Sequence, residues 1–412
     1  MLSLRFALYV CLVAVGYSVV FDGSASAAAE KTLHAFTDGS DGGSPYGGLI
    51  ADSQGNLYGT AQDGGTLGYG TVYKLTRTAS GWTGTTLYDF QGGTNDGASP
   101  GNNLAFDSAG NLYGITFQGG IGWNNPAVRG WGTVFMLTPS GSKWAEKVIH
   151  FFAANYRPSS GLVIDKTGDM FGETGGAANG PGGTIYGMRN GSAGWEFQTL
   201  FDFAGSGSSF PVGGLFDNAG NLYGVAGNGG ASCCGTVFEL KRGANNSWTE
   251  SVLYSFTGLS DGGGPAGPLV SNATGKLYGA TAFGGDLSCQ DGSGCGVAFE
   301  LALSAGVWTE TVLHTFTNSP DGDAPGAGMV FDKSGNLYGT TAAGGADGYG
   351  TVFELSPQSG GEWNETVLFS FTNSDGADPT APLLLGLGNI YGTAYAGGEF
   401  GWGVVFELPA GQ

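Results

Sequence analysis

Histidine and basic residues are scarce in this chain of 412 residues, which has 3 His and 14 Lys and Arg against 34 Asp and Glu. The resulting net charge of −20 argues against nucleic acid and anionic membrane surfaces as partners, because both attract basic patches. Only 12% of the residues are charged, yet 26 Phe, 17 Tyr and 9 Trp supply ample apolar surface. The chain is therefore expected to fold around a core rather than to be disordered.

Long apolar runs are missing after the N-terminus. The one such run extends from Phe6 to Phe21, follows Arg5 and is succeeded by small residues in an A-x-A arrangement, Ala25 to Ala29. This pattern predicts a secretory signal peptide over residues 1–29. The alternative is an uncleaved anchor, since a run of about 16 residues is near the lower limit for a membrane span. We expect a secreted or periplasmic protein without a membrane anchor.

Glycine, by contrast, is abundant, with 82 residues, and much of it belongs to an internal repeat. Seven variants of the word GNLYGT begin at Gly55, Gly110, Gly168, Gly220, Gly275, Gly335 and Gly388. The steps between them are 55, 58, 52, 55, 60 and 53 residues. A near-constant period of this size indicates supersecondary units that bury their apolar faces against one another.

Each copy contains four short runs rich in β-branched and aromatic residues. In the sixth copy they are residues 328–332, 336–341, 350–355 and 363–371, which we name strands a, b, c and d. Short connections make neighbouring strands antiparallel. Asp opens the a–b turn at Asp52, Asp107, Asp217 and Asp332, with a variant at Asp165. Four-stranded repeats of this kind predict a β-propeller; a glycine-rich β-solenoid is the alternative fold.

The two ends of the repeat array are complementary. The last copy stops after strand c, Gly403 to Leu408, whereas Glu30 to Phe36 has the pattern of an isolated strand d. We therefore predict an all-β, closed seven-bladed β-propeller over residues 30–412, in which the N-terminal strand completes the last blade and leaves no open sheet edge. A monomer is expected.

The segment GNLYGTT…GG…GYGTVFEL, from Gly335 to Leu355, resembles the GloVer tandem repeat of secreted bacterial proteins. The likeness extends from about Glu30 to Leu408 and is weakest in the third copy, Gly168 to Met188. The resemblance implies secretion without stable anchoring, because the C-terminal anchoring segment of many members has no counterpart here. It implies no catalytic residue.

Five of the seven d–a loops carry Asp-Gly-x-x-Pro, beginning at Asp41, Asp96, Asp261, Asp321 and Asp375. Asp and Gly form turns, and Pro stiffens the entry to strand a, so we interpret the motif as structural. The alternative is a calcium-binding ring of carboxylates. We expect no metal and no cofactor.

Candidate catalytic groups are periodic rather than singular. His34, His150 and His314 occupy one strand-d position, which other copies fill with Tyr or Phe, so they are predicted to pack and not to act as bases. Glu residues recur in strand c and again in strand d. A glycosidase needs a singular carboxylate pair, and a serine or cysteine triad needs a base. We therefore predict no catalytic residue.

The b–c loops are the most individual part of the repeat. Before their final Gly, the loops of blades 6, 7, 1 and 2 carry an aromatic residue: Tyr349, Trp402, Tyr69 and Trp131. The long loop of blade 2 adds Trp123, Asn125 and Arg129. Exposed rings beside amides suit sugars, so we predict a ligand-binding arc on this face; inter-blade packing is the alternative.

Four cysteines follow the predicted signal peptide, in the b–c loops of adjacent blades: Cys233, Cys234, Cys289 and Cys295. Export and an even number favour disulfides, and we expect all four to be oxidised. The sequence leaves open whether Cys289 pairs with Cys295, beside a vicinal Cys233–Cys234 pair, or whether Cys234 and Cys295 bridge two blades.

These features together favour a secreted binding scaffold with an extracellular glycan or protein partner. The alternative is an extracellular enzyme, a hydrolase or lyase, that degrades polysaccharide.

Overall fold

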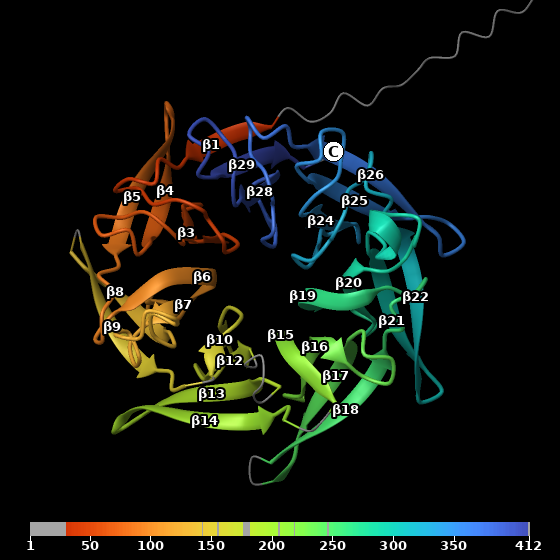
Figure 1. Cartoon of the computed structure of the whole chain (residues 1–412), viewed down its shortest axis with the longest axis horizontal. Coiled ribbons are helices and arrows are strands. Elements are labelled where there is room, and N and C mark those ends of the chain that lie inside the picture. The colour runs from red at the N-terminus through yellow and green to blue at the C-terminus, as the bar shows by residue number, and fades with distance from the viewer. Residues whose placement is uncertain are drawn as a thin grey trace, which may run out of the picture.

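The computed structural model describes residues 30–410 apart from 142, 155, 176–181, 205–206, 218 and 245–246. Its strands form seven antiparallel sheets arranged around one axis (Figure 1). The predicted all-β, seven-bladed propeller is thus confirmed. In the described part of the chain, no helix is long and apolar enough to cross a membrane. The predicted signal peptide, residues 1–29, lies outside the described residues.

Each blade is a meander that runs from the axis outwards. The innermost strands, a, are β2 (Ile50–Ala51), β6 (Gly97–Phe106), β10 (Arg157–Pro158) with β11 (Val163–Ile164), β15 (Ser208–Phe216), β19 (Gly263–Ser271), β23 (Val330–Phe331) and β27 (Leu384–Gly386). Strands b are β3 (Leu57–Ala61), β7 (Leu112–Gly119), β12 (Met170–Gly175), β16 (Leu222–Gly229), β20 (Leu277–Phe283), β24 (Leu337–Thr341) and β28 (Asn389–Ala394). Strands c are β4 (Thr71–Thr78), β8 (Thr133–Ser140), β13 (Thr184–Gly191), β17 (Thr236–Arg242), β21 (Val297–Ser304), β25 (Thr351–Pro357) and β29 (Val404–Pro409). The outermost strands, d, are β5 (Gly81–Asp89), β9 (Lys143–Phe151), β14 (Gly194–Asp202), β18 (Trp248–Ser255), β22 (Val307–Thr315), β26 (Trp363–Ser370) and β1 (Lys31–Ala35).

The N-terminal strand closes the ring, as predicted. β1 pairs antiparallel with β29, with Lys31 opposite Glu407 and Ala35 opposite Val404. The two ends of the array therefore meet in one sheet, visible where the red β1 lies beside the dark blue β29 (Figure 1). Pairing satisfies the backbone groups that β29 would otherwise expose at an edge.

The repeated word is explained by packing between strands b and c. Gly339 lies opposite Phe353, and a Cβ atom on Gly339 would be 2.5 Å from Cζ of that ring. The other six blades repeat this pairing: Gly59 with Tyr73, Gly114 with Phe135, Gly172 with Tyr186, Gly224 with Phe238, Gly279 with Phe299 and Gly392 with Phe406. The rings fill the space between blades; Phe316, Leu337 and Phe353, for example, share one buried cluster. The core is thus a series of blade-to-blade layers.

The a–b turn uses its Asp as the sequence predicts. Oδ1 of Asp332 accepts hydrogen bonds from the backbone N–H groups of Ser334 and Asn336, each at 2.8 Å. Oδ2 accepts a third from Nδ2 of Asn336 at 3.0 Å. Asp52, Asp107 and Asp217 make the same contacts with their own turns.

A proline at the entry to each blade packs against a glycine of the blade before it. Gly350 has φ +95°, and a Cβ atom on it would lie 2.7 Å from Cδ of Pro379. The seven pairs are Gly70–Pro100, Gly132–Pro158, Gly183–Pro211, Gly235–Pro265, Gly296–Pro325, Gly350–Pro379 and Gly403–Pro45. Pro158 and Pro211 keep the contact although their loops lack the Asp. Proline, rather than aspartate, is therefore the common element of the junctions.

Candidate functional site: the axial cavity and the b–c face

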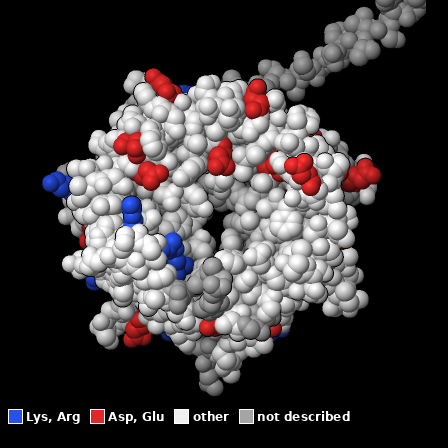
Figure 2. All heavy atoms as spheres, viewed as in Figure 1, with Lys and Arg blue, Asp and Glu red and all other residues white. Residues whose placement is uncertain are grey.

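A cavity of about 280 Å³ lies on the axis of the ring, in the hollow at the centre of Figure 2. Every blade contributes residues that follow its entry proline, so the cavity begins where strands a begin. From the first blade to the seventh these include Tyr46, Asn102, Ser159, Val212, Ala266, Gly326 and Thr380.

The cavity wall is neutral. Among the described lining residues, Tyr46 is the one with a titratable side chain, and burial raises the pKa of its phenol, which keeps it protonated. Asn102 donates from Nδ2 to the carbonyl of Ser159 at 3.0 Å, and Oδ1 of Asn103 accepts from the N–H of Gly48 at 2.7 Å. The wall therefore presents amides, hydroxyls and backbone groups from neighbouring blades, together with apolar side chains such as Leu162, Val212 and Pro268.

Tyr46 lines the end of the cavity that faces the b–c loops and belongs to a cluster of three aromatic rings. The ring of Tyr46, 38% exposed, packs edge-to-face on Phe117 and Tyr395 at centroid distances of 5.6 and 6.0 Å. Phe117 lies near the end of β7 and Tyr395 directly after β28, next to the b–c loops of blades 2 and 7. Tyr46 was not among the predicted site residues, although it breaks the repeat: a smaller residue follows the entry proline in every other blade.

The repeated position before the final Gly of the b–c loop has a backbone role. The carbonyls of Tyr69, Tyr349 and Trp402 accept hydrogen bonds from the next d–a loop, from Ser99 N, Asp378 N and Ser44 N at 2.8, 3.1 and 2.7 Å. The side chains differ in their role: Tyr69 and Trp131 pack against buried core clusters, and Cys295 is itself buried. The side chains of Tyr349 and Trp402 are 39% and 40% exposed.

The structure divides the predicted arc. Trp123 of the long blade 2 loop packs edge-to-face on Tyr69, with ring centroids 5.2 Å apart, so this pair joins blades 1 and 2. Trp131 instead lies under the guanidinium of Arg157 at 5.9 Å. Oδ1 of Asn125 accepts a hydrogen bond from the N–H of Ala127 in the same loop, at 3.1 Å. Arg129 is exposed and has a backbone φ of +51°. These contacts support the packing interpretation of this loop, and the binding interpretation stays a prediction.

The face formed by the b–c and d–a loops, which we call the b–c face, is the more apolar end of the ring. Its exposed large apolar residues are Tyr46, Leu67, Ile121, Phe210, Leu259, Leu287, Tyr349, Phe400 and Trp402. The opposite end exposes Leu303, Val307 and Leu387. Exposed apolar side chains are thus more numerous on the b–c face than on the opposite end.

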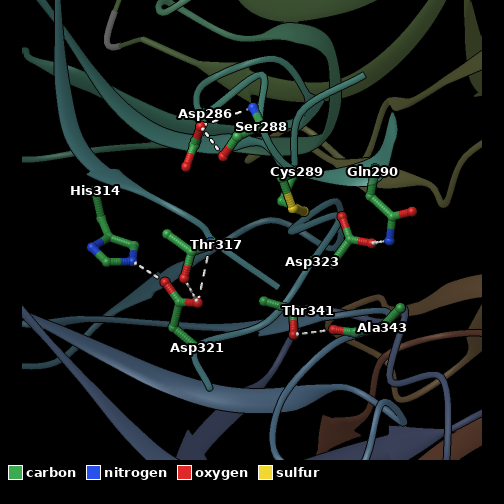
Figure 3. Close-up of a disulfide and its surroundings, with 11 residues drawn as sticks. Asp286, Ser288, Cys289, Gln290, His314, Thr317, Asp321, Asp323, Thr341 and Ala343 are labelled. Atoms are coloured by element: carbon green, nitrogen blue, oxygen red, sulfur yellow. Dashed lines mark hydrogen bonds and ion pairs between the residues drawn. A yellow bond between two sulfur atoms is a disulfide. The ribbon is translucent and has the colours of Figure 1, made fainter. Parts of the chain in front are cut away.

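The Asp-Gly-x-x-Pro carboxylates hold their turns, as predicted. Oδ1 of Asp321 accepts from N and Oγ1 of Thr317, at 3.1 and 2.7 Å, and Oδ2 lies 2.9 Å from Nε2 of His314 (Figure 3). Asp41 makes the same contacts with Thr37 and His34. The described residues contain no group of three or more His, Cys, Asp or Glu that could hold a metal.

Glu173 is a singular group that sequence analysis overlooked. The other copies have Thr60, Ile115, Val225, Ala280, Thr340 and Thr393 at its place in strand b. Its side chain is 3% exposed, its Oε2 has no hydrogen-bond partner, and burial raises its pKa to about 8. A Cβ atom on Gly214, in the cavity wall, would lie 3.6 Å from its Oε1. One protonated carboxyl group thus lies directly behind the wall.

One of the two predicted cysteine pairings is present in part: its Cys289–Cys295 bond forms, but its Cys233–Cys234 bond does not. Cys289 and Cys295 form a disulfide across the 3₁₀ turn η2 (Gln290–Gly292) (Figure 3). Cys233 and Cys234 are free, with Sγ atoms 3.6 Å apart. The structure thus differs from the expectation that all four are bonded, and the Cys289–Cys295 bond rules out the alternative Cys234–Cys295 bridge. Adjacent Cα atoms are about 3.8 Å apart, closer than the roughly 4.4 Å that most disulfides require.

These features define a β-propeller with a neutral axial cavity and an aromatic rim. The model of the Gloeobacter/Verrucomicrobia repeat matches residues 12–190, 123–309 and 287–412, and the chain belongs to that family. The resemblance to the GloVer repeat is thereby confirmed.

Solved structures share the architecture at low identity. A protein of Bacteroides uniformis described as a "putative 6-phosphogluconolactonase" is 12% identical, with a TM-score of 0.52 over 84% of this chain and 89% of that one. A protein of Dyadobacter fermentans of unknown function is 13% identical, with a TM-score of 0.45 over 82% and 96%. These likenesses concern the fold alone. No curated protein matches the sequence.

Proposed function

We propose that this protein is an exported binding scaffold that holds a neutral glycan in the axial cavity, against the aromatic rim of the b–c face. The observation that carries the proposal is the neutral wall of amides, hydroxyls and backbone groups, with the exposed ring of Tyr46 at its end. Sugar rings bind by flat contact with aromatic faces and by hydrogen bonds to such groups.

The size and placement of the cavity agree with this proposal. Its volume of about 280 Å³ is near the lower end of ligand pockets, roughly 300–1,000 Å³, and suits one sugar residue or the end of a chain. Tyr349 and Trp402, exposed on the same face, offer further contacts for a longer glycan.

Binding fits the geometry better than bond cleavage. A hydrolase or lyase acting here would need a general acid and a base beside the bound sugar. Glu173 supplies one carboxyl group, and it lies behind Gly214 rather than in the wall. The described wall residues add no second carboxylate or imidazole.

A glycan array followed by calorimetry tests the proposal. Replacing Tyr46 with Ala should weaken the best ligand by about 1–3 kcal/mol, as expected for the loss of a stacked ring. Tyr46→Phe is the matched control and should bind almost as tightly as the parent. Trp123→Ala separately tests whether the long b–c loop of blade 2 contributes to ligand binding. Equal binding by the parent and Tyr46→Ala would place the site elsewhere, and release of cleaved sugar would favour the enzyme.

A further inference from the structure

One place in strand d carries a side chain in six blades and none in the remaining one. The residue there pairs with the last buried residue of strand c: Gly84 with Leu75, Glu146 with Leu137, Phe197 with Met188, Glu250 with Leu240, Glu310 with Leu301 and Glu365 with Leu355. Glu30 takes this place in the seventh blade, since the next residue, Lys31, pairs with Glu407. Five blades thus present a Glu, one a Phe, and blade 1 a glycine.

This place faces two parts of the preceding blade. One is its d–a loop, and the other is the strand-d position that is occupied by His, Tyr or Phe. Where blade 5 meets blade 6, Glu365 lies near the hydrogen-bonded pair His314 and Asp321, and its Oε1 is buried without a partner. Burial raises the pKa of Glu365 to about 7, the nearby His314 lowers it and Asp321 raises it further. In blade 3, Phe197 stacks on His150 at a centroid distance of 4.0 Å. A side chain therefore fills the interface beside both of these histidines.

Where blade 7 meets blade 1, the same imidazole–carboxylate pair borders a cavity. Nε2 of His34 lies 3.1 Å from Oδ2 of Asp41, as in the His314–Asp321 pair. Gly84 adds no side chain, and a cavity of about 220 Å³ remains between His34, Asp41 and Thr85. Nδ1 of His34 is 3.5 Å from the position that a Cβ atom on Gly84 would occupy.

The surrounding residues determine the protonation states of the groups that line this cavity. Burial lowers the pKa of His34, so the free site holds a neutral imidazole at pH 7. The nitrogen that faces Asp41 then carries the hydrogen, which leaves Nδ1 as a hydrogen-bond acceptor toward the cavity. Asp41 and Tyr73 are the other titratable lining groups, and burial raises the pKa of Tyr73, which is therefore uncharged.

We propose that this cavity binds a small organic acid, whose carboxyl group takes the place that the Glu carboxyl group takes in five other blades. The acid brings its own proton, which moves to Nδ1 of His34. The carboxylate then faces an imidazolium that Asp41 holds from the other side, and no other bond changes. The site is separate from the axial cavity and does not depend on the proposed glycan.

Propionate is the natural probe, because it is the Glu side chain cut at its Cα bond. Titration into the purified protein, followed by the NMR signals of the His34 ring, should show one saturable site. Since each anion binds with one proton, affinity should fall as the pH rises from 6 to 8, by up to about tenfold per pH unit. Propionamide should bind at least tenfold more weakly. Glucuronate is the second arm, and tighter binding than propionate would assign the site to an acidic sugar.

Two substitutions use the repeat as its own control. Gly84→Glu should abolish propionate binding; a Cβ atom there meets only ordinary contacts of 3.5 Å, and the rest of the side chain would occupy the cavity. Glu365→Gly should create a second site, reported by His314. Unchanged propionate binding in Gly84→Glu, equal binding of propionamide, or no response of His34 would each overturn the proposal. If Glu365→Gly does not fold, the Gly84→Glu comparison still decides.

Discussion

A Cβ atom on Gly403 would lie 2.5 Å from Cδ of Pro45, so the last blade and the first meet through a contact that depends on glycine. The same pairing occurs at all seven junctions, which makes the closing junction equivalent to the six within the chain. Closure therefore depends on this contact as well as on the pairing of β1 with β29.

Substitution of Gly403 tests this junction. Gly403 has φ +88°, and a Cβ atom there would also meet the carbonyl of Ala394 at 2.5 Å. Gly388, at φ +80° in the same blade, has no atom within 4 Å of that position. Gly388→Ala should therefore cost roughly 1 kcal/mol of backbone strain, and Gly403→Ala about 3 kcal/mol or more because overpacking is added. Equal losses in urea unfolding would contradict the role of the proline contact.

The interface glutamates should make stability fall as pH rises toward neutrality. Burial raises the pKa of Glu146, Glu310 and Glu365 to about 7 from an ordinary 4.5. Between these values the folded state keeps protons that the unfolded state has released, so the free energy of unfolding declines with rising pH and levels off above 7. After allowance for partial exposure, each contributes about 1 kcal/mol.

Glu310→Gln should reduce the fall of the free energy of unfolding with rising pH. At pH 8 the variant should be more stable than the parent. Urea unfolding at pH 5, 6, 7 and 8 measures it, with exposed Glu362→Gln as the control. An unchanged slope in Glu310→Gln would show that its carboxyl group is solvated in the folded state.

The histidines should separate into two kinds. His150 stacks on Phe197 without a carboxylate partner, and burial lowers its pKa to about 4. His150→Phe should be nearly neutral at pH 8 and stabilising at pH 5, where unfolding of the parent takes up a proton. His314→Phe removes a hydrogen bond to buried Asp321 and should cost about 1–3 kcal/mol at pH 8. Similar effects of the two substitutions in urea unfolding would refute the distinction.

Thiol titration should find two reactive groups in unreduced, denatured protein. The structure leaves Cys233 and Cys234 free and joins Cys289 to Cys295. Reduction should add two thiols and loosen the η2 loop, whose Gln290 donates to Asp323 at the entry to blade 6. Since the bond closes a short loop, we expect a loss of roughly 2–3 kcal/mol and a ring that stays folded. Finding no thiol before reduction would instead show that all four cysteines are oxidised.

Prediction of the fold succeeded where the determinants are local. Turn residues and alternating apolar runs act over a few residues. The sequence therefore predicted the Asp332 turn, the strand beginning at Leu337 and the pairing of β1 with β29. Prediction of the site was less complete. Tyr46 and Glu173 break the repeat and could have been noticed, but only their surroundings show that they adjoin one cavity.

The amino-acid sequence by itself determined the number of blades, the order of the strands and the closure of the ring, since a period, its turns and its complementary ends are all written along the chain. The tertiary structure alone decided which of the residues at equivalent positions face open space. His34 and His314 are equivalent in sequence, yet one borders a cavity and the other a glutamate. That difference comes from the next blade, where Gly84 or Glu365 completes the interface, because blades bury their surfaces only against one another.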